Sequence, residues 1–243
     1  MSDQLKNQDS IAEGVVQPLY APIKRRSFFM YAGATAGATA LVLAGCSKDE
    51  ENTPGGNLVS LGGGDDFAVL NFAYALEQLE AAFYTTLRDG AYYKGLATNS
   101  AEKQVLDDLY YHEVIHREFF KAALGTKAIK GLTPNFTAIN MADRTSVLGA
   151  AKSFEDLGVS AYNGAGQYLT SPLYLTLAGK IVSVEARHAA LIRDLISEGT
   201  FVGSDVVTVT TNSLEISRTP TDVVAMANKF LAEGSMLDAS GIK

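Results

Sequence analysis

Thiol and imidazole groups are scarce in this sequence of 243 residues, which has one cysteine, Cys46, three histidines and no tryptophan. Because a disulfide needs two cysteines and a thiolate metal site usually needs more, the chain has neither an internal disulfide framework nor such a site. Iron–sulfur clusters, which are held by several cysteines, are excluded for the same reason. The three histidines are His112, His116 and His188.

Basic residues are also in the minority. The 20 lysines and arginines are outnumbered by 27 aspartates and glutamates, and the formal net charge is −7. Because an acidic surface repels phosphate backbones, we expect no nucleic-acid partner. Apolar residues make up 47% of the chain and charged residues 19%, which is typical of a globular protein.

The chain lacks a strong transmembrane run. Residues 28–45 are only mildly hydrophobic and contain three glycines, so a membrane anchor there is the weaker interpretation. Residues 24–46 have a basic start, an apolar centre and small residues before Cys46, as secretory signals do. The pair Arg25-Arg26 resembles a twin-arginine export signal, and residues 43–46 resemble a lipobox. We therefore expect an exported lipoprotein, attached to the membrane through a lipid on Cys46 and facing the periplasm or the cell surface.

Composition divides the rest of the chain. Residues 47–64 are polar, with five glycines and one proline, and are expected to form a flexible tether. Residues 65–199 carry a periodic apolar pattern and are expected to form the main domain. Residues 200–243 are expected to be a C-terminal extension with a short helix at 220–232.

Apolar residues recur at spacings of three and four in four segments of the main domain, which predicts four amphipathic helices. Between the second and third helices, residues 125–143 are irregular and would form a long crossover. The fold class is therefore an all-α antiparallel four-helix bundle. The predicted helices are about 65–89, 100–124, 144–169 and 172–199.

Acids and histidines interrupt the apolar face in the middle of each predicted helix, and their order repeats. A glutamate is followed seven residues later by a tyrosine, and the next helix carries Glu-x-x-His. Residues three apart share one helix face, so each Glu and His of that motif could reach one metal ion. A buried carboxylate without a partner is costly, whereas a shared pair of divalent cations would stabilise several of them. The repeated residues are Glu77, Tyr84, Glu113 and His116, then Glu155, Tyr162, Glu185 and His188.

This pattern resembles that of the ferritin-like di-iron carboxylate proteins, in which two helices give one Glu each and two give Glu-x-x-His. Residues 71–84 also resemble exported bacterial ferritin-like domain proteins, some of them called desiccation-related. The resemblance covers roughly residues 65–198 and implies a ferritin-like bundle with two iron or manganese ions. It implies terminal ligands Glu77 and Glu155, bridging ligands Glu113 and Glu185, and one histidine for each metal, His116 and His188.

Rival assignments exist for several of these positions. Glu80 competes with Glu77 on the first helix, and Asp156 competes with Glu155 on the third. His112 lies on another face of its helix and is expected to be structural or to support a ligand. Surface ion pairs are the alternative for the two Glu-x-x-His glutamates, with Arg117 and Arg187 as nearby partners.

The predicted donor set contains four carboxylates and two imidazoles, which suits iron or manganese better than zinc or copper. Two such ions could reduce O₂ or peroxide by two electrons while Fe(II) is oxidised. We therefore expect a di-iron oxidoreductase, ferroxidase-like or peroxide-scavenging, in envelope iron or oxidative-stress protection. Tyr84 and Tyr162 are the catalytic candidates, with core packing as their alternative. The competing function is a non-catalytic envelope lipoprotein whose metal site is structural or vestigial; a homodimer is compatible with either.

Overall fold

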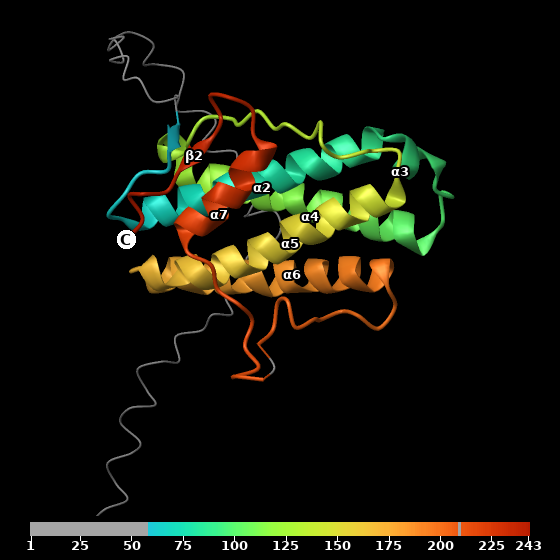
Figure 1. Ribbon diagram of the computed structural model, residues 1–243. Coiled ribbons are helices and arrows are strands. Elements are labelled where there is room, and N and C mark those ends of the chain that lie inside the picture. The colour runs from blue at the N-terminus through green and yellow to red at the C-terminus, as the bar shows by residue number, and fades with distance from the viewer. Residues whose placement is uncertain (1–57, 209) are drawn as a thin grey trace, which may run out of the picture. The chain divides into compact units, whose positions relative to one another are not determined.

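The computed structural model describes residues 58–208 and 210–243. Four long helices dominate it, as the sequence predicts: α2 (Asp66–Asp89), α4 (Ala101–Leu124), α5 (Arg144–Ala165) and α6 (Pro172–Ile196). Helix α2 packs against α4, and α5 packs against α6, in an all-α four-helix bundle (Figure 1). Within the described ranges, no helix is long and apolar enough to cross a membrane. The expected export signal and Cys46 lie outside those ranges.

Side-chain caps explain why the four helices begin where they do. Each follows a residue whose side-chain oxygen accepts a hydrogen bond from a backbone N–H three residues later. In α6 this cap is followed by Pro172 at the first helical position, where a missing N–H is harmless. The capping residues are Asp65, Ser100, Asp143 and Ser171.

The crossover between α4 and α5 is fixed along the side of α2. The Asn71 side chain donates to the Lys127 carbonyl at 3.0 Å and accepts from the Ile129 N–H at 2.9 Å. About two turns further along α2, the Gln78 amide oxygen accepts from the Leu132 N–H at 2.9 Å. The irregular crossover is therefore tied to the bundle by the polar side chains of Asn71 and Gln78 on α2.

A short helix, α3 (Ala91–Gly95), lies between α2 and α4 in the chain.

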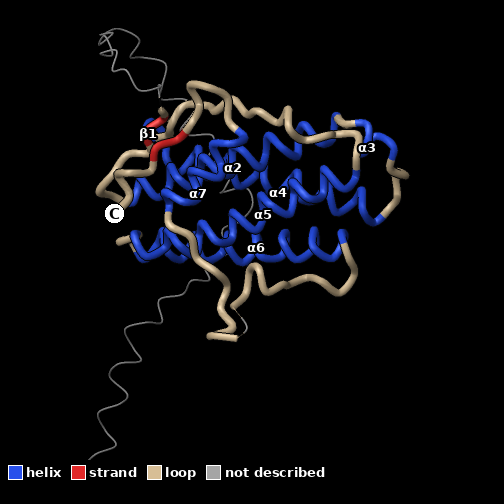
Figure 2. The backbone as a smooth tube through the Cα atoms, viewed as in Figure 1, coloured by secondary structure: helices blue, strands red, loops and turns tan. Residues whose placement is uncertain are grey.

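The C-terminal extension covers the side of the bundle formed by α2 and α5. Its helix α7 (Pro220–Ala227) packs against both of them, and the chain continues into strand β2 (Leu237–Asp238). This strand pairs in parallel with β1 (Val59–Ser60), which precedes α2 (Figure 2). Leu61, next to β1, is fully buried. Val59 and Leu61 are thus buried, although both lie within residues 47–64, where the sequence predicts a flexible tether.

The apolar interior falls into two clusters. The larger contains Phe83, Tyr84 and Phe154, whose side chains are almost entirely buried. The smaller contains Phe120 and Tyr162, at the end of the bundle where α2 begins. On α4 and α6, the Glu-x-x-His segments lie between residues of the two clusters. The polar residues thus occupy the middle of the bundle, with apolar packing toward either end.

Candidate metal centre

The six predicted ligands meet in the interior of the bundle, each long helix contributing at least one of them. All four glutamates have no exposed surface, and His188 is 2% exposed. The His116 side chain is 13% exposed and is the most accessible of the set. They form two groups of four, in which the donor atoms lie within 4.8 Å of one another. The groups are Glu77, Glu113, His116 and Glu185, and Glu113, Glu155, Glu185 and His188.

The first group surrounds Nδ1 of His116. This nitrogen lies 2.8 Å from Glu185 Oε1, 3.4 Å from Glu77 Oε2 and 3.7 Å from Glu113 Oε2. These atoms come from α2, α4 and α6, so the group depends on the packing of three helices. Because Glu113 and His116 are three residues apart, α4 presents both of them on one face.

The second group repeats the first around Nδ1 of His188. This nitrogen lies 2.8 Å from Glu113 Oε1, 3.4 Å from Glu155 Oε2 and 3.6 Å from Glu185 Oε2. Glu113 and Glu185 therefore turn one oxygen toward each group. The remaining glutamate of each group contributes to that group alone. This is the arrangement expected of two bridging and two terminal carboxylates.

These donor atoms lack other partners. In the described part of the chain, eight buried side-chain nitrogen and oxygen atoms lack a hydrogen-bond partner of good geometry, and all eight face into the two groups, where their short contacts are with one another. Buried polar atoms are normally hydrogen-bonded, so such a concentration needs a specific cause. Ligand atoms about 2.1 Å from a shared cation lie roughly 3.0 to 3.4 Å apart, and the separations of 2.8 to 3.7 Å are close to this. The residues present fit two divalent cations.

The electrostatics of the metal-free site also indicate a place for positive charge. Burial raises the pKa of Glu77, and the neighbouring Glu185 raises it further. Burial opposes ionisation of Glu185 as well, but His116 and His188 outweigh it and lower its pKa to about 2. Burial lowers the pKa of His116, but Glu113, Glu185 and Glu77 outweigh it and raise this pKa to about 12. Protonated histidines therefore balance the carboxylates when no cation is bound.

Two tyrosines hold the terminal glutamates crosswise. The Tyr84 hydroxyl, on α2, donates to Oε1 of Glu155 on α5. The Tyr162 hydroxyl, on α5, donates at 2.5 Å to Oε1 of Glu77 on α2. In each glutamate the bonded oxygen is the one that does not face the metal group, so the tyrosine orients the other. The seven-residue step from Glu to Tyr thus places each tyrosine against the opposite half of the bundle.

His112 supports only one of the two histidines. Its Nδ1 lies 2.8 Å from Nε2 of His188, and the two rings are stacked with centroids 5.1 Å apart. Metal-binding histidines commonly use their second nitrogen in this way, which fixes the tautomer and the ring orientation. Val184 precedes Glu185 as His112 precedes Glu113, so the other half of the repeat has no matching imidazole. The sequence did not reveal this contact because it joins α4 to α6.

Glu80, the rival of Glu77, belongs to neither metal group, although it is only 3% exposed. Burial raises its pKa well above the ordinary value, and the charges of Glu113 and Glu185 contribute further. It lies against Gly158, where a Cβ atom would be 3.0 Å from Glu80 Oε1. The glycine therefore leaves room for this additional carboxyl group.

Two other residues considered from the sequence, Asp156 and Arg117, form ion pairs outside the metal groups. Asp156 accepts hydrogen bonds from the Arg193 guanidinium at 2.9 and 2.7 Å, which places its charge in a separate ion pair. Arg117 pairs with its neighbour Glu118 at 2.7 Å. The surface ion pair that was the alternative for Glu113 does not form, because Glu113 is fully buried.

A four-helix bundle whose interior holds two carboxylate–histidine groups defines a class of metal-binding helical proteins. The family comparison identifies the domain that forms this bundle. The model of the ferritin-like domain matches residues 65–198, more than half of the chain, and the chain belongs to that family. No curated protein matches the sequence.

Proposed function

We propose that the protein binds two iron ions, or manganese in their place, and acts as a di-iron oxidoreductase. In this proposal Glu77 and Glu155 are terminal ligands, Glu113 and Glu185 bridge, and each ion has one histidine, His116 or His188. The observation that carries the proposal is the set of eight buried donor atoms that face one another without hydrogen bonds. A site rich in carboxylates favours iron or manganese over zinc or copper.

When bound, two adjacent Fe(II) ions supply two electrons, which suffice to reduce O₂ to hydrogen peroxide, or hydrogen peroxide to water. The chain contributes a water-poor interior and fixed donor atoms. Tyr84 and Tyr162 hold Glu155 and Glu77 in place, and burial keeps both phenols protonated by raising their pKa well above the ordinary value. Each tyrosine is thereby placed to supply a proton or an electron close to the metal groups, which is the catalytic role that we propose for them.

Metal analysis and Fe(II) oxidation in air test this proposal on the purified protein. Wild-type protein should retain iron or manganese and oxidise Fe(II), and Glu113→Gln should lose both properties while its circular dichroism stays helical. Glu118→Gln, on the exposed side of the same helix, is the matched control and should behave as wild type. A protein that binds the metal but does not oxidise Fe(II) would support the alternative of a structural or stress-protection role.

Export and lipidation form the cellular part of the proposal. It rests on residues 24–46, which have the parts of a signal, with Cys46 at the end of the lipobox-like sequence. In a cell expressing the full chain, Cys46→Ser should move the protein from the membrane fraction to the soluble fraction. Unchanged membrane association would contradict lipidation at this residue.

A further inference from the structure

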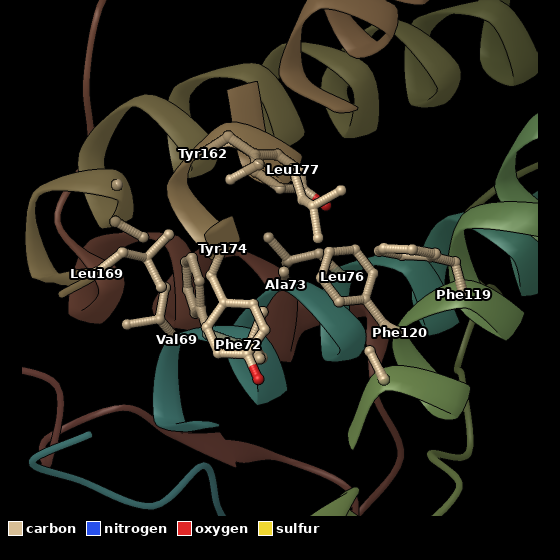
Figure 3. A pocket seen from close by; sticks show the side chains of 15 residues that line it. Val69, Phe72, Ala73, Leu76, Phe119, Phe120, Tyr162, Leu169, Tyr174 and Leu177 are labelled. Carbon is tan, nitrogen blue, oxygen red and sulfur yellow. The ribbon is translucent and has the colours of Figure 1, made fainter. Parts of the chain in front are cut away.

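The smaller apolar cluster contains a cavity of about 40 Å³. All four long helices contribute to its walls, and Figure 3 shows the side chains converging on it. Its inner wall includes buried residues of α2 and α5 and the buried Phe120 of α4, while α6, Phe119 and Ala123 supply half-exposed or exposed surface. The cavity therefore extends from the rim of the bundle toward the interior. Representative lining residues are Ala73, Leu76, Phe120, Tyr162, Tyr174 and Ala178.

The walls of this cavity are suited to an apolar occupant. Its lining residues are aliphatic, aromatic or glycine, and the Tyr162 hydroxyl already donates to Glu77. A buried water molecule needs two to four polar partners, and the hydroxyls of Tyr162 and Tyr174 are the only polar side-chain groups among the lining residues, so we expect a largely dry cavity. The volume is well below the roughly 150 Å³ of an engineered cavity that binds benzene. A molecule of one or two heavy atoms fits better than a ring or an acyl chain.

The cavity shares a wall with the candidate metal centre. The Tyr162 side chain lines the cavity, and its hydroxyl bonds to Oε1 of Glu77 at 2.5 Å, while Oε2 of Glu77 faces the first metal group. Leu76, another lining residue, directly precedes Glu77 in α2. A small molecule in the cavity would therefore lie next to the side chain that orients a terminal ligand.

The corresponding tyrosine in the other half, Tyr84, is fully buried beside a cluster of aromatic rings. Tyr84 has no exposed surface, and its ring centroid lies 5.2 Å from that of Phe83. Phe83 in turn contacts Phe154 at 4.9 Å and Phe136 at 5.8 Å between ring centroids. Of the two tyrosines, Tyr162 is the one that lines the cavity, and Tyr84 is not among the lining residues.

We infer that this cavity is a binding pocket for dioxygen, which makes O₂ rather than peroxide the oxidant that reaches the centre from this side. Dioxygen is small and apolar, whereas hydrogen peroxide would give up its hydrogen bonds to water on entering a dry cavity. The inference rests on the proposed function for its chemical meaning. The existence of the gas pocket can be tested without any metal.

Xenon is the probe for the metal-free protein. We expect ¹²⁹Xe NMR, or a crystal pressurised with xenon, to show binding beside Ala73 and Tyr162. Ala178→Leu, which adds methyl groups at the half-exposed wall, should abolish or strongly weaken the binding. Ala123→Leu at the exposed rim is a second filling variant that does not disturb the core, and Ala150→Leu, beside the larger cluster, is the control. Absence of xenon from this position in folded wild-type protein, or binding unchanged by both filling variants, would overturn the pocket.

Iron-loaded protein tests whether the pocket serves dioxygen. In Ala178→Leu we expect the KM for O₂ to rise several-fold, with iron content and the rate with added hydrogen peroxide unchanged. Equal loss of both rates, or an unaltered KM for O₂, would overturn the assignment to dioxygen. Wild-type protein that binds xenon but retains no iron would refute the proposed function alone. Rapid Fe(II) oxidation without a xenon site would refute the pocket alone.

Discussion

The two halves of the bundle, α2 with α4 and α5 with α6, carry the same donor residues in different surroundings. Each half has a Glu followed by Tyr and then Glu-x-x-His, and each tyrosine bonds the terminal glutamate of the other half. Outside the donors the correspondence ends. Glu80 of α2 corresponds to Gly158 of α5, since each comes three residues after the terminal glutamate. The two carboxylate–histidine groups are thus alike in donor residues and unequal in what lies around them.

The bridging and terminal glutamates should differ most when one of them is removed. Glu113 turns an oxygen to both groups, so Glu113→Ala should abolish binding at both positions. Glu155 faces the second group alone, so Glu155→Ala should leave about one ion per chain. Metal content by mass spectrometry, with helicity as the folding check, measures the difference. Retention of one ion by Glu113→Ala would show that the positions do not share Glu113.

His116 and His188 should both make the stability of the metal-free protein depend on pH. The pKa of His116 is about 12 in the folded metal-free protein, above its unfolded value of roughly 6.5, and that of His188 is raised too. This stabilisation is complete below pH 6.5 and decreases as the pH rises toward the folded pKa. Each histidine should lower the free energy of unfolding by about 1.4 kcal/mol per pH unit above pH 6.5.

Urea unfolding of the metal-free protein between pH 6.5 and 9 measures this slope. His116→Gln should reduce it, and so should His188→Gln. Metal-loaded protein should show the reverse trend, because the ligands release protons on binding and the metal affinity rises with pH. A metal-free protein that becomes more stable from pH 6.5 to 9 would contradict the proton-linked account.

The hydrogen bond between His112 and His188 should make one metal position tighter than the other. His112→Ala should weaken the position of His188 by about 10- to 100-fold, the usual effect of losing an outer partner of a ligand. Val184→Ala, the matched change in the other half, should leave the position of His116 unaltered. Titration with Co(II), followed by absorption spectroscopy, resolves the two affinities. Equal weakening of both positions by His112→Ala would contradict a specific effect of His112 on the position of His188.

The smallest expected effect concerns the space between Glu80 and Gly158. Alanine stabilises a helix interior by about 1 kcal/mol relative to glycine, but at Gly158 its Cβ would crowd the Glu80 carboxyl. Gly158→Ala should therefore give this gain in a Glu80→Ala background and little or none in the wild type. Gly149→Ala, at an open and exposed position of the same helix, should give the gain in both. Thermal unfolding of the two single variants and the double variant measures these gains. If Gly158→Ala stabilised the wild type as much as the Glu80→Ala background, the contact between residue 158 and Glu80 would be contradicted.

The sequence predicts those parts of the fold and site that depend on local spacing. Helical periodicity and caps locate the four helices, and the three-residue step of Glu-x-x-His places two ligands on one face. The same periodicity cannot choose between Glu77 and Glu80, because residues three apart share a face. The structure places Glu77 in a metal group and Glu80 beside Gly158.

Contacts between distant segments could not be derived in this way. The crosswise bond from Tyr162 to Glu77 and the contact of His112 with His188 each join two helices, so no local pattern encodes them. The cavity likewise depends on how four helices pack together. The pairing of β1 with β2 joins residues at opposite ends of the described chain.

That parallel pairing means that the cooperative folding unit is larger than the segment that defines the family. A fragment cut to residues 65–198 would lose β1, β2 and α7 together. It would then expose the α2 and α5 surfaces against which Leu61 and the fully buried Val223 are packed. The segments on either side of the family match thus pair with each other, and a fragment cut to residues 65–198 would remove that pairing.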